Sequence, residues 1–538
     1  MPSEVAYTPL GRLEELDRLD LAGVLDYLRI YLKNFLLDAD VAMALAGRLL
    51  REPGLDQQPR ALRSLAYVLA KAVQAAPFDA RIADLAARLT GDPVLARRAA
   101  LLAALPTDRA AWSVARCLGK PRLLQSRRDW LAAELRRHPG HAAYAAQLLA
   151  LDFFAGEPPG DWLGLFRPPA ELLPAWNRLL FCHLAEIGRD AAALDLWPRV
   201  EAAGQSGRDE TALNLAAELY RRAGDAVTAQ SLYACSLALD PLQEPVRRRL
   251  AGLAAPFAPD ASLTQSLDVT VCLYSWNKAR LLQQTLETLA NTNLGRARVR
   301  VLINGSTDDS LAMARAAAGL FPGRDYQVVA LPVNVGAPGA RNWLLSLPEV
   351  RQAEFVAFLD DDAEAPAHWL AGLLAALESD PGAAVAGSKV VSPGAPAMLQ
   401  YLYRTLAVAR KNLIRLTDPT PIARYDTGLY DVVRPADNVM GCCHLLRTAH
   451  LEGVPGFDIR YSPSQVDDVA HDLELRLAGR RVLFCGPVTC VHHQSTGISF
   501  GVRPSGPALG NVLGNDVKFH AWFAPRLADL QKLMGESR

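Results

Sequence analysis

Three consecutive carboxylates form the most chemically distinctive feature of the sequence: Asp360, Asp361 and Asp362 directly follow the strand-like segment 354–359. Carboxylates at the end of a buried strand are costly unless a cation neutralises them. One oxygen-preferring divalent ion, Mg²⁺ or Mn²⁺, held between Asp360 and Asp362 would remove that cost, because these ions bind through one or two carboxylates together with substrate phosphates. A solvated acidic turn that caps the helix expected from Pro366 is the alternative.

The residues around this acidic run alternate between short β-rich segments and helical segments. This pattern, which begins after residue 268, is typical of an α/β domain with a mostly parallel sheet. Ligands bind outside the carboxyl ends of the strands in such sheets, so we expect a site where these segments end. The expected strands are 269–274, 299–303, 326–331, 354–359 and 384–391, and the expected helices lie near 278–290, 308–319, 338–347, 366–378 and 467–478.

Polar residues and glycines follow the predicted strands at that edge. Ser275 and Asn277 come after the first strand, and Asn304 opens the turn after the second. Asn334 and Gly336 shape the turn that precedes the next helix. We therefore expect these residues to contact a ligand at the same edge of the sheet as the acidic run.

The N-terminal half differs from the second half in composition and in the spacing of its apolar residues. Residues 1–254 are rich in Ala, Leu and Arg, with apolar positions three and four residues apart, which is typical of stacked amphipathic helices. The segment 212–241 resembles a helix–turn–helix repeat of the tetratricopeptide kind, and part of its spacing recurs thirty-six residues upstream. Such a domain is either a packed bundle without a ligand or a solenoid whose groove holds a peptide or protein. The matching positions are Tyr220, Gly224, Ala229, Tyr233 and Pro241 in one unit and Leu184, Gly188, Ala193 and Trp197 in the other.

Composition limits the class of protein. The chain has 538 residues with 57 Lys and Arg against 57 Asp and Glu, so no global basic field attracts nucleic acid or anionic lipid. No uninterrupted apolar run reaches the length of a membrane span, and the first residues lack the pattern of a secretory signal peptide. The eight cysteines form no C-x-x-C pair, as expected of thiols in a reducing compartment. We therefore expect a soluble, cytoplasmic protein with no transmembrane segment and no nucleic-acid partner.

Four blocks in the second half resemble the successive motifs of family 2 glycosyltransferases with the A-type nucleotide-sugar fold. They read VTVCLYSWNKARLLQQTLETL from residue 269, VRVLINGSTDDS from 299, NVGAPGARNWLL from 334 and FVAFLDDD from 355. The segment 441–493 resembles the acceptor-side block of the family, in which a Gly-Phe-Asp turn precedes an acidic pair, a helix ending in Ala-Gly, a strand and a closing histidine. The order and spacing of the blocks, over about 269–493, carry the resemblance.

The resemblance implies a transferase of the hexosyltransferase type that uses a nucleoside-diphosphate sugar, with a UDP-sugar as the default donor. Asp360 and Asp362 match the D-x-D motif of the family, which binds the ribose of the donor and a divalent metal, Mn²⁺ or Mg²⁺, on its diphosphate. Arg341 matches the arginine of the A-R-N block, which implies that it orders the acidic turn or the nucleotide. An ion pair with one of the aspartates is the alternative role for Arg341.

The acceptor-side block implies further roles. Asp467 and Asp468 match the acidic pair in which one carboxylate deprotonates the acceptor hydroxyl, and counting back from Gly479 places Asp468 at the position of the base. Adjacent carboxylates raise each other's proton affinity, which suits such a base, whereas acidic residues that stabilise a helix N-terminus are the alternative. His492 and His493 match the position of a third metal ligand, with a structural role or an acceptor contact as the alternative.

Departures from the family pattern limit the prediction. Ile303 stands where the family commonly has an acidic residue that reads uracil, so the base of the donor is left open, and Ala470 replaces a second acid after the base. The Q-x-x-R-W signature of processive synthases is absent, which favours a single addition. One acceptor-side base without an evident enzymic nucleophile favours inversion of the sugar.

The predicted organisation is a helical-repeat domain at 1–254, a linker at 255–267, a catalytic domain at 268–500 and a C-terminal loop and helix at 501–538, which could close as a lid. The expected acceptor is a protein, a glycan or a lipid-linked molecule, and the repeat domain would select it or dock to a partner. Two other functions stay open: a catalytically inactive repeat scaffold that binds sugar nucleotides, and a nucleotidyltransferase.

Overall fold

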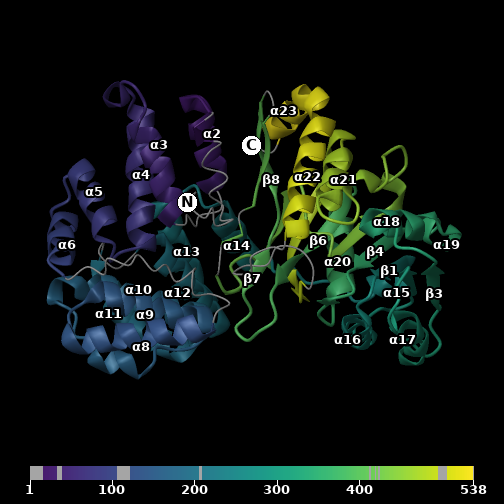
Figure 1. Ribbon diagram of the computed structural model, residues 1–538, viewed down its shortest axis with the longest axis horizontal. Helices are drawn as coiled ribbons and strands as arrows, with labels where there is room; N and C mark the ends of the chain where they lie inside the picture. Colours follow the sequence, from purple (N-terminus) through teal and green to yellow (C-terminus); the bar gives the residue numbers. More distant parts are fainter. Residues whose placement is uncertain are drawn as a thin grey trace. The chain divides into compact units, whose positions relative to one another are not determined.

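The structure is a computed structural model that describes residues 16–17, 19–32, 39–105, 121–204, 209–410, 413–418, 420–421, 424–494 and 506–536. The chain divides into two compact units. One unit consists of Met1–Leu253 and Pro421–Leu429, and the other of Ala254–Thr420 and Tyr430–Arg538. Figure 1 labels many of the elements of the two units.

The described part of the first unit is mostly helical. Gly188 and Gly224 have φ angles of 74° and 86°, and they connect helices that pack against each other. Trp197 and Tyr233 are buried between these helices. The predicted helical architecture is confirmed, and its relation to tetratricopeptide repeats stays a prediction. The helices are α2 (Leu21–Leu32), α3 (Ala39–Leu50), α4 (Pro59–Ala75), α5 (Ala80–Thr90), α6 (Pro93–Ala103), α8 (Pro121–Arg137), α9 (Ala142–Ala155), α10 (Leu173–Glu186), α11 (Asp190–Ala202), α12 (Glu210–Arg222), α13 (Ala226–Leu239) and α14 (Glu244–Ala254).

The short segment Pro421–Leu429 belongs to the helical unit although it lies far along the chain. Arg424 Nη1 donates to Glu186 Oε1 at 2.7 Å, and Tyr425 OH donates to Phe153 O at 2.6 Å. The rings of Tyr425 and Phe153 also meet edge to face, with centroids 5.0 Å apart. Burial raises the pKa of Glu186, and the charge of Arg424 opposes this shift. Residues from the second half of the chain thus complete the helical unit.

The second unit is built on a mixed sheet with the strand order β10-β12-β6-β11-β4-β1-β2-β3, in which β5 pairs with β12 and β7 with β6. Strands β4, β1, β2 and β3 pair in parallel, whereas β11 runs antiparallel between β4 and β6. The predicted α/β fold class is confirmed. The strands are β1 (Val269–Ser275), β2 (Arg298–Asn304), β3 (Tyr326–Leu331), β4 (Phe355–Leu359), β5 (Ala363–Glu364), β6 (Ala383–Val391), β7 (Leu399–Tyr401), β10 (Val433–Ala436), β11 (Cys443–Arg447) and β12 (Arg481–His492), with β8 (Thr405–Arg410) and β9 (Leu413–Thr417) in a separate two-stranded sheet.

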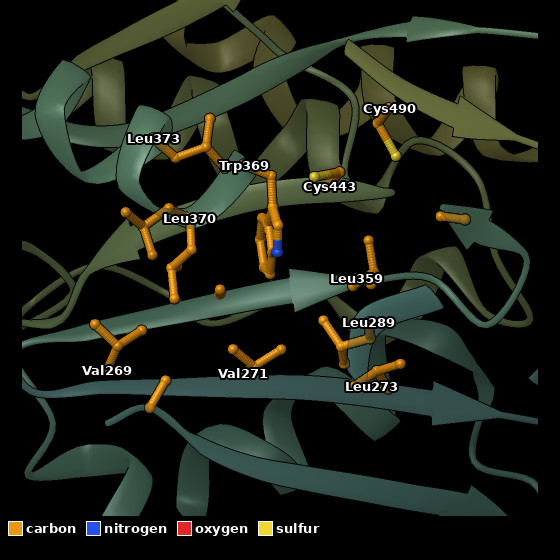
Figure 2. Packing of buried hydrophobic residues seen from close by; sticks show 14 of the residues in the cluster. Val269, Val271, Leu273, Leu289, Leu359, Trp369, Leu370, Leu373, Cys443 and Cys490 are labelled. Carbon is orange, nitrogen blue, oxygen red and sulfur yellow. The ribbon is translucent and has the colours of Figure 1, made fainter. Parts of the chain in front are cut away.

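A buried apolar core joins this sheet to the helices that connect its strands (Figure 2). Val271 and Leu273 of β1 lie in one cluster with Leu359 of β4 and Trp369, which starts α20. Trp369 is fully buried, and its Nε1 donates to Thr292 Oγ1 at 3.2 Å. This core fixes the carboxyl ends of β1 and β4 next to each other. The helices are α15 (Leu263–Ser266), α16 (Ala279–Ala290), α17 (Ser310–Ala316), α18 (Gly336–Ser346), α19 (Pro348–Arg351), α20 (Trp369–Glu378) and α21 (Asp467–Leu477).

Two C-terminal helices, α22 (Gly506–Phe523) and α23 (Leu527–Glu536), follow the sheet. Phe519, Phe523 and Leu530 share a buried cluster with Leu473 of α21, so these helices pack against α21. The loop part of the predicted C-terminal lid, 501–505, lies outside the described residues. No helix in the described ranges combines the length and apolarity that crossing a bilayer requires.

Candidate functional site

The acidic run follows β4 at the carboxyl edge of the sheet. Asp360 N donates to Cys442 O at 2.8 Å, and His493 N donates to Asp362 O at 2.9 Å, so backbone hydrogen bonds hold both ends of the run. The side chains of Asp360, Asp362 and His492 converge, because one ligand atom of each lies within 4.8 Å of the others. Asp362 and His492 are buried, and Asp360 is partly exposed. The structure thus brings together three of the residues singled out as metal ligands.

Gln400 of β7 orients His492. Gln400 Nε2 donates to His492 O at 3.0 Å, so its Oε1 faces His492 Nδ1 at 2.7 Å. An amide oxygen only accepts hydrogen bonds, and His492 Nδ1 therefore carries a hydrogen. His492 Nε2 lies 3.1 Å from Asp362 Oδ1. Two lone pairs would face each other there unless a metal ion or a hydrogen on Nε2 lies between the two atoms.

Lys278, directly before α16, supplies a cation on the other side of the run. Its Nζ lies 2.9 Å from Asp361 Oδ1 and 2.9 Å from Asp362 Oδ2. Burial lowers the pKa of Lys278, but the two aspartates outweigh this effect and raise the pKa above its ordinary value. Burial raises the pKa of Asp361 to about 6, although Lys278 opposes the shift. Lys278 thus pairs with Asp362 Oδ2, whereas Asp362 Oδ1 faces His492 Nε2.

The remaining donors suit a divalent ion. Carboxylate oxygens are ligands for Mg²⁺ and Mn²⁺, and an imidazole nitrogen is acceptable to Mn²⁺. The hydrogen bond from His492 Nδ1 to Gln400 is the outer support that histidine ligands of metals typically have. Asp360, Asp362 and His492 therefore fit the metal expected from the sequence.

Arg341 of α18 joins the acidic run to the second acidic pair. Its Nη1 pairs with Asp467 Oδ2, and its Nη2 lies 3.6 Å from Asp360 Oδ1. The guanidinium lies over the rings of Tyr274 and Phe457, at 5.2 and 5.1 Å from their centroids. Burial lowers the pKa of Arg341, but Tyr274 and the nearby aspartates raise it overall, so Arg341 stays charged. The ion pair that the sequence left open as an alternative for Arg341 is present.

Asp467 and Asp468 begin α21 and have different surroundings. Asp467 is buried, and its carboxylate accepts a hydrogen bond from Arg341 Nη1. Burial raises the pKa of Asp467, and the charge of Arg341 opposes this shift. Asp468 is only partly buried, and its Oδ2 accepts a hydrogen bond from Gly441 N at 2.9 Å. One carboxylate is therefore committed to a buried ion pair, and the other keeps access to solvent.

The amide side chains expected to contact a ligand bind one another. Asn304 Nδ2 donates to Asn334 Oδ1 at 2.9 Å, and Asn304 Oδ1 accepts from Val335 N at 3.0 Å. Gly336 N also donates to Asn334 Oδ1, at 2.8 Å. Gly336 has a φ of 79°, and a Cβ there would lie 2.6 Å from Ser462 Oγ, so a glycine is required. These residues shape the loop before α18.

Asn277 and Ser275 lie where β1 ends. Asn277 Oδ1 accepts from Thr307 N at 2.7 Å and so ties the loop after β1 to the loop after β2. Ser275 is buried and is the register partner of Ile303 in the parallel pair of β1 and β2. Ile303 is itself buried, so the position of the expected base-reading acid belongs to the apolar core.

The structure does not bring His493 into the cluster. His493 Nε2 lies 2.6 Å from Glu364 Oε1, while its neighbour His492 faces Asp362. Consecutive residues of an extended chain point to opposite sides, which explains the difference.

Sequence reasoning also missed Lys278 and Gln400. A basic residue after β1 could have signalled Lys278, whereas no sequence pattern signals Gln400.

Residues 270–428 match the family model described as Glycosyl transferase family 2. The matched segment includes the acidic run, Lys278 and Arg341, and it ends before α21. No curated protein matches the chain significantly. The segment 270–428 therefore matches a glycosyltransferase family 2 domain, the family that this part of the sequence was expected to resemble.

Solved structures similar to this chain include GalNAc-T7 with UDP, GalNAc and Mn²⁺, at 14% identity and a TM-score of 0.37 over 46% of this chain and 47% of that chain. The mannosyltransferase PcManGT from Pyrobaculum calidifontis, in complex with GDP-Man and Mn²⁺, is 19% identical, with a TM-score of 0.34 over 57% of this chain and 86% of that one. TarS 1–349 from S. aureus is 18% identical, with a TM-score of 0.29 over 41% and 60% of the two chains. The chain spans about half the length (47%) of the first of these structures.

Proposed function

We propose that this chain is a metal-dependent, inverting glycosyltransferase that moves a sugar from a nucleoside-diphosphate sugar to an acceptor hydroxyl in a single addition. One observation carries the metal-dependent part of the proposal. His492 Nδ1 is engaged by Gln400, and one ligand atom each of Asp360, Asp362 and His492 lies within 4.8 Å of the others, which is a spacing that one metal ion can bridge. The family 2 domain at residues 270–428 indicates the class of reaction.

The donor side of the proposed mechanism rests on Asp360, Asp362 and His492, which would hold Mn²⁺ or Mg²⁺. A divalent ion bound there neutralises the negative charge that develops on a departing diphosphate. Lys278 lowers the repulsion among the aspartates, and Gln400 keeps His492 Nε2 free of its hydrogen so that it can act as a ligand. Lys278 and Gln400 thus set the charge balance of the site and the orientation of His492 before the donor binds.

On the acceptor side, Asp468 is proposed as the general base. Its carboxylate takes the proton of the acceptor hydroxyl, whose oxygen forms a bond to the anomeric carbon while the bond from that carbon to the diphosphate oxygen breaks. Its partial exposure supports this role, because an acceptor has to reach the base. Asp467 is instead committed to the buried pair with Arg341. In this proposal Asp468 therefore transfers the proton, and Asp467 holds Arg341 in place.

Turnover of a donor tests the proposal directly. The full-length protein is incubated with Mn²⁺ and a panel of UDP-, GDP- and other nucleoside-diphosphate sugars, and release of nucleoside diphosphate is measured with and without EDTA. Metal-dependent release from at least one donor supports the proposal. Saturable donor binding without turnover of any donor would indicate a binding scaffold, and pyrophosphate release from a nucleoside triphosphate and a sugar phosphate would indicate a nucleotidyltransferase.

We propose that the helical unit selects a protein acceptor or docks to a partner, because stacked helices expose long grooves. A deletion of residues 1–254 tests this role, combined with Arg424→Ser and Tyr425→Ser since these side chains pack into the helical unit. Donor hydrolysis should persist, and transfer to the natural acceptor should fall.

We also propose a cytoplasmic location, because all seven cysteines that the structure describes are free thiols.

A further inference from the structure

Two residues with left-handed backbone precede the acidic pair. Gln465 and Val466 have φ angles of 82° and 74°, and α21 begins immediately afterwards at Asp467. Each non-glycine residue in this region costs on the order of 1–3 kcal/mol and persists only where its surroundings hold it. The turn that aims Asp467 and Asp468 therefore needs support from another part of the fold.

Asn515 of α22 provides this support. Its side chain is fully buried, with 0% exposure, and its Nδ2 lies 2.9 Å from Ser464 O and 3.0 Å from Gln465 O. The same nitrogen lies 3.2 Å from Tyr461 O. Asn515 Oδ1 accepts a hydrogen bond from Lys518 Nζ at 2.9 Å. Carbonyl oxygens on one side and an ammonium group on the other fix the orientation of the amide.

Neighbouring residues of α22 extend these contacts. Asn511 Nδ2 donates to Ser464 O at 2.8 Å, and Lys518 Nζ donates to Arg460 O at 2.7 Å. Positions 511, 515 and 518 follow the helical period and so share one face of α22. That face is a row of donors directed at the carbonyl oxygens of residues 460–465.

The opposite side of the turn contacts the start of α18. Ala337 N donates to Pro463 O at 2.7 Å. Ser462 lies against Gly336, which has no space for a side chain. The turn is therefore clamped between α18, which carries Arg341, and α22. The contact with α18 consists of a backbone hydrogen bond and the close approach of Ser462 to Gly336, whereas the contact with α22 is made by the side chains of that helix.

We propose that Asn515 is a positioning residue for the acidic pair. By holding the turn 461–466, it places the Asp468 carboxylate where it can remove the proton of the acceptor. This inference rests on the proposed function, and it extends the catalytic machinery to a helix outside the segment 270–428 that matches the family model. Loss of the Asn515 amide releases the turn and leaves the metal and nucleotide side of the site unchanged.

Kinetics of Asn515→Ala test the role in transfer. We expect kcat to fall about 10- to 100-fold, since small displacements of a reacting group have effects of this size. The KM for the donor and the dissociation constant of the nucleoside diphosphate should stay at their wild-type values. Val517→Ala, a change at a position on the same helix that is 69% exposed, is the matched control and should behave as the wild type.

Hydrogen exchange tests the structural step without any turnover. In Asn515→Ala the backbone amides of residues 461–470 should exchange faster, while those of strand 298–304 keep their wild-type protection. Asn511→Ala removes one donor from a less buried position, so we expect it to disturb the fold less and to show a smaller change in the same direction.

Each outcome of these measurements has a defined meaning. Wild-type exchange of residues 461–470 in both variants overturns the inference, and so does a loss of kcat matched by an equal rise in the donor KM. Faster exchange confined to 461–470 together with a selective fall in kcat supports it. A wild-type protein that turns over no donor overturns the proposed function, whereas the exchange experiment still decides whether Asn515 holds the turn.

Discussion

Lys278 Nζ lies 2.9 Å from Asp362 Oδ2, so a residue that follows β1 neutralises part of the acidic run that follows β4. β1 and β4 are parallel neighbours in the sheet, and their carboxyl ends therefore bring the two residues together. The same nitrogen lies 2.9 Å from Asp361 Oδ1. Part of the charge neutralisation at this site is thus provided by the fold before any ion binds.

Lys278→Met should make the protein depend more strongly on a divalent metal. Breaking a buried ion pair costs about 3–5 kcal/mol, and because the Lys278 side chain is 17% exposed we expect a loss near the lower end of that range. The melting temperature in EDTA should fall, and Mn²⁺ should raise it by more than in the wild type. Lys532→Met, at a position 76% exposed, is the control. An equal Mn²⁺-induced rise in wild type and Lys278→Met would contradict the prediction.

Asp362→Ala should abolish the stabilisation by Mn²⁺. The change removes the carboxylate that faces His492 Nε2 and leaves Lys278 paired with Asp361. A ligand at a hundred times its dissociation constant stabilises the folded state by about 2.7 kcal/mol, so the wild type should show a clear rise in melting temperature that the variant lacks. Glu378→Gln, which changes a carboxylate that is 40% exposed, should respond like the wild type. Titration calorimetry that shows unaltered Mn²⁺ affinity in Asp362→Ala would refute the ligand assignment.

Asp468→Asn should separate chemistry from binding. The asparagine oxygen can still accept the hydrogen bond from Gly441 N, so the fold and the affinity for the nucleoside diphosphate should persist. Loss of a general base typically lowers the rate by about 10²–10⁴-fold, and we expect kcat for transfer to fall within that range. Stopped assays with the donor identified in the panel measure this rate. Normal transfer by the variant would move the base to another residue.

Asp467→Asn should affect stability first. The change removes the ion pair with Arg341 and leaves a buried guanidinium with a weaker partner, Asp360 at 3.6 Å. We expect a loss of about 3 kcal/mol in stability, seen as a lower melting temperature in both EDTA and Mn²⁺. A variant with the melting temperature of the wild type and no transfer activity would instead assign the base to Asp467.

Much of the fold and part of the site could be predicted from the sequence because the signals are local. The five predicted strands agree with the structure to within one residue at each end, since short β-rich runs between helices have clear limits. Asp360 and Asp362 could be placed because they directly follow such a strand. His492 could be placed only through the resemblance to the family, and nothing local distinguished it from His493.

The remaining features depend on contacts between residues far apart in the sequence. Gln400 is 92 positions from His492, and Asn515 is 54 positions from Tyr461, so neither partner could be read from a motif. The mutual binding of Asn304 and Asn334 shows the same limit, because both were expected to face a ligand. Polar residues at a strand end can satisfy a ligand or one another, and only the three-dimensional arrangement distinguishes these cases.

Asp472, one turn beyond Asp468, should make stability depend on pH. It is buried, and its Oδ2 accepts hydrogen bonds from Asn438 Nδ2 at 2.8 Å and Val439 N at 3.0 Å. Burial nevertheless raises the pKa of Asp472 well above its ordinary value of 3.8. The folded state then holds a proton that the unfolded state has released. The contribution of this group to stability is therefore complete below pH 3.8 and is lost as the pH rises through the folded-state pKa.

Asp472→Asn removes this dependence, because an amide keeps an acceptor for both hydrogen bonds and carries no charge. We expect the melting temperature of the variant, relative to that of the wild type, to rise by a few degrees between pH 4 and pH 8, since a tenfold change in proton affinity corresponds to about 1.4 kcal/mol. Asp529→Asn, at a carboxylate that is 55% exposed, should give a curve parallel to the wild type. Parallel curves for Asp472→Asn and wild type over this range would show that Asp472 is ionised in the folded state and that its hydrogen bonds outweigh its burial.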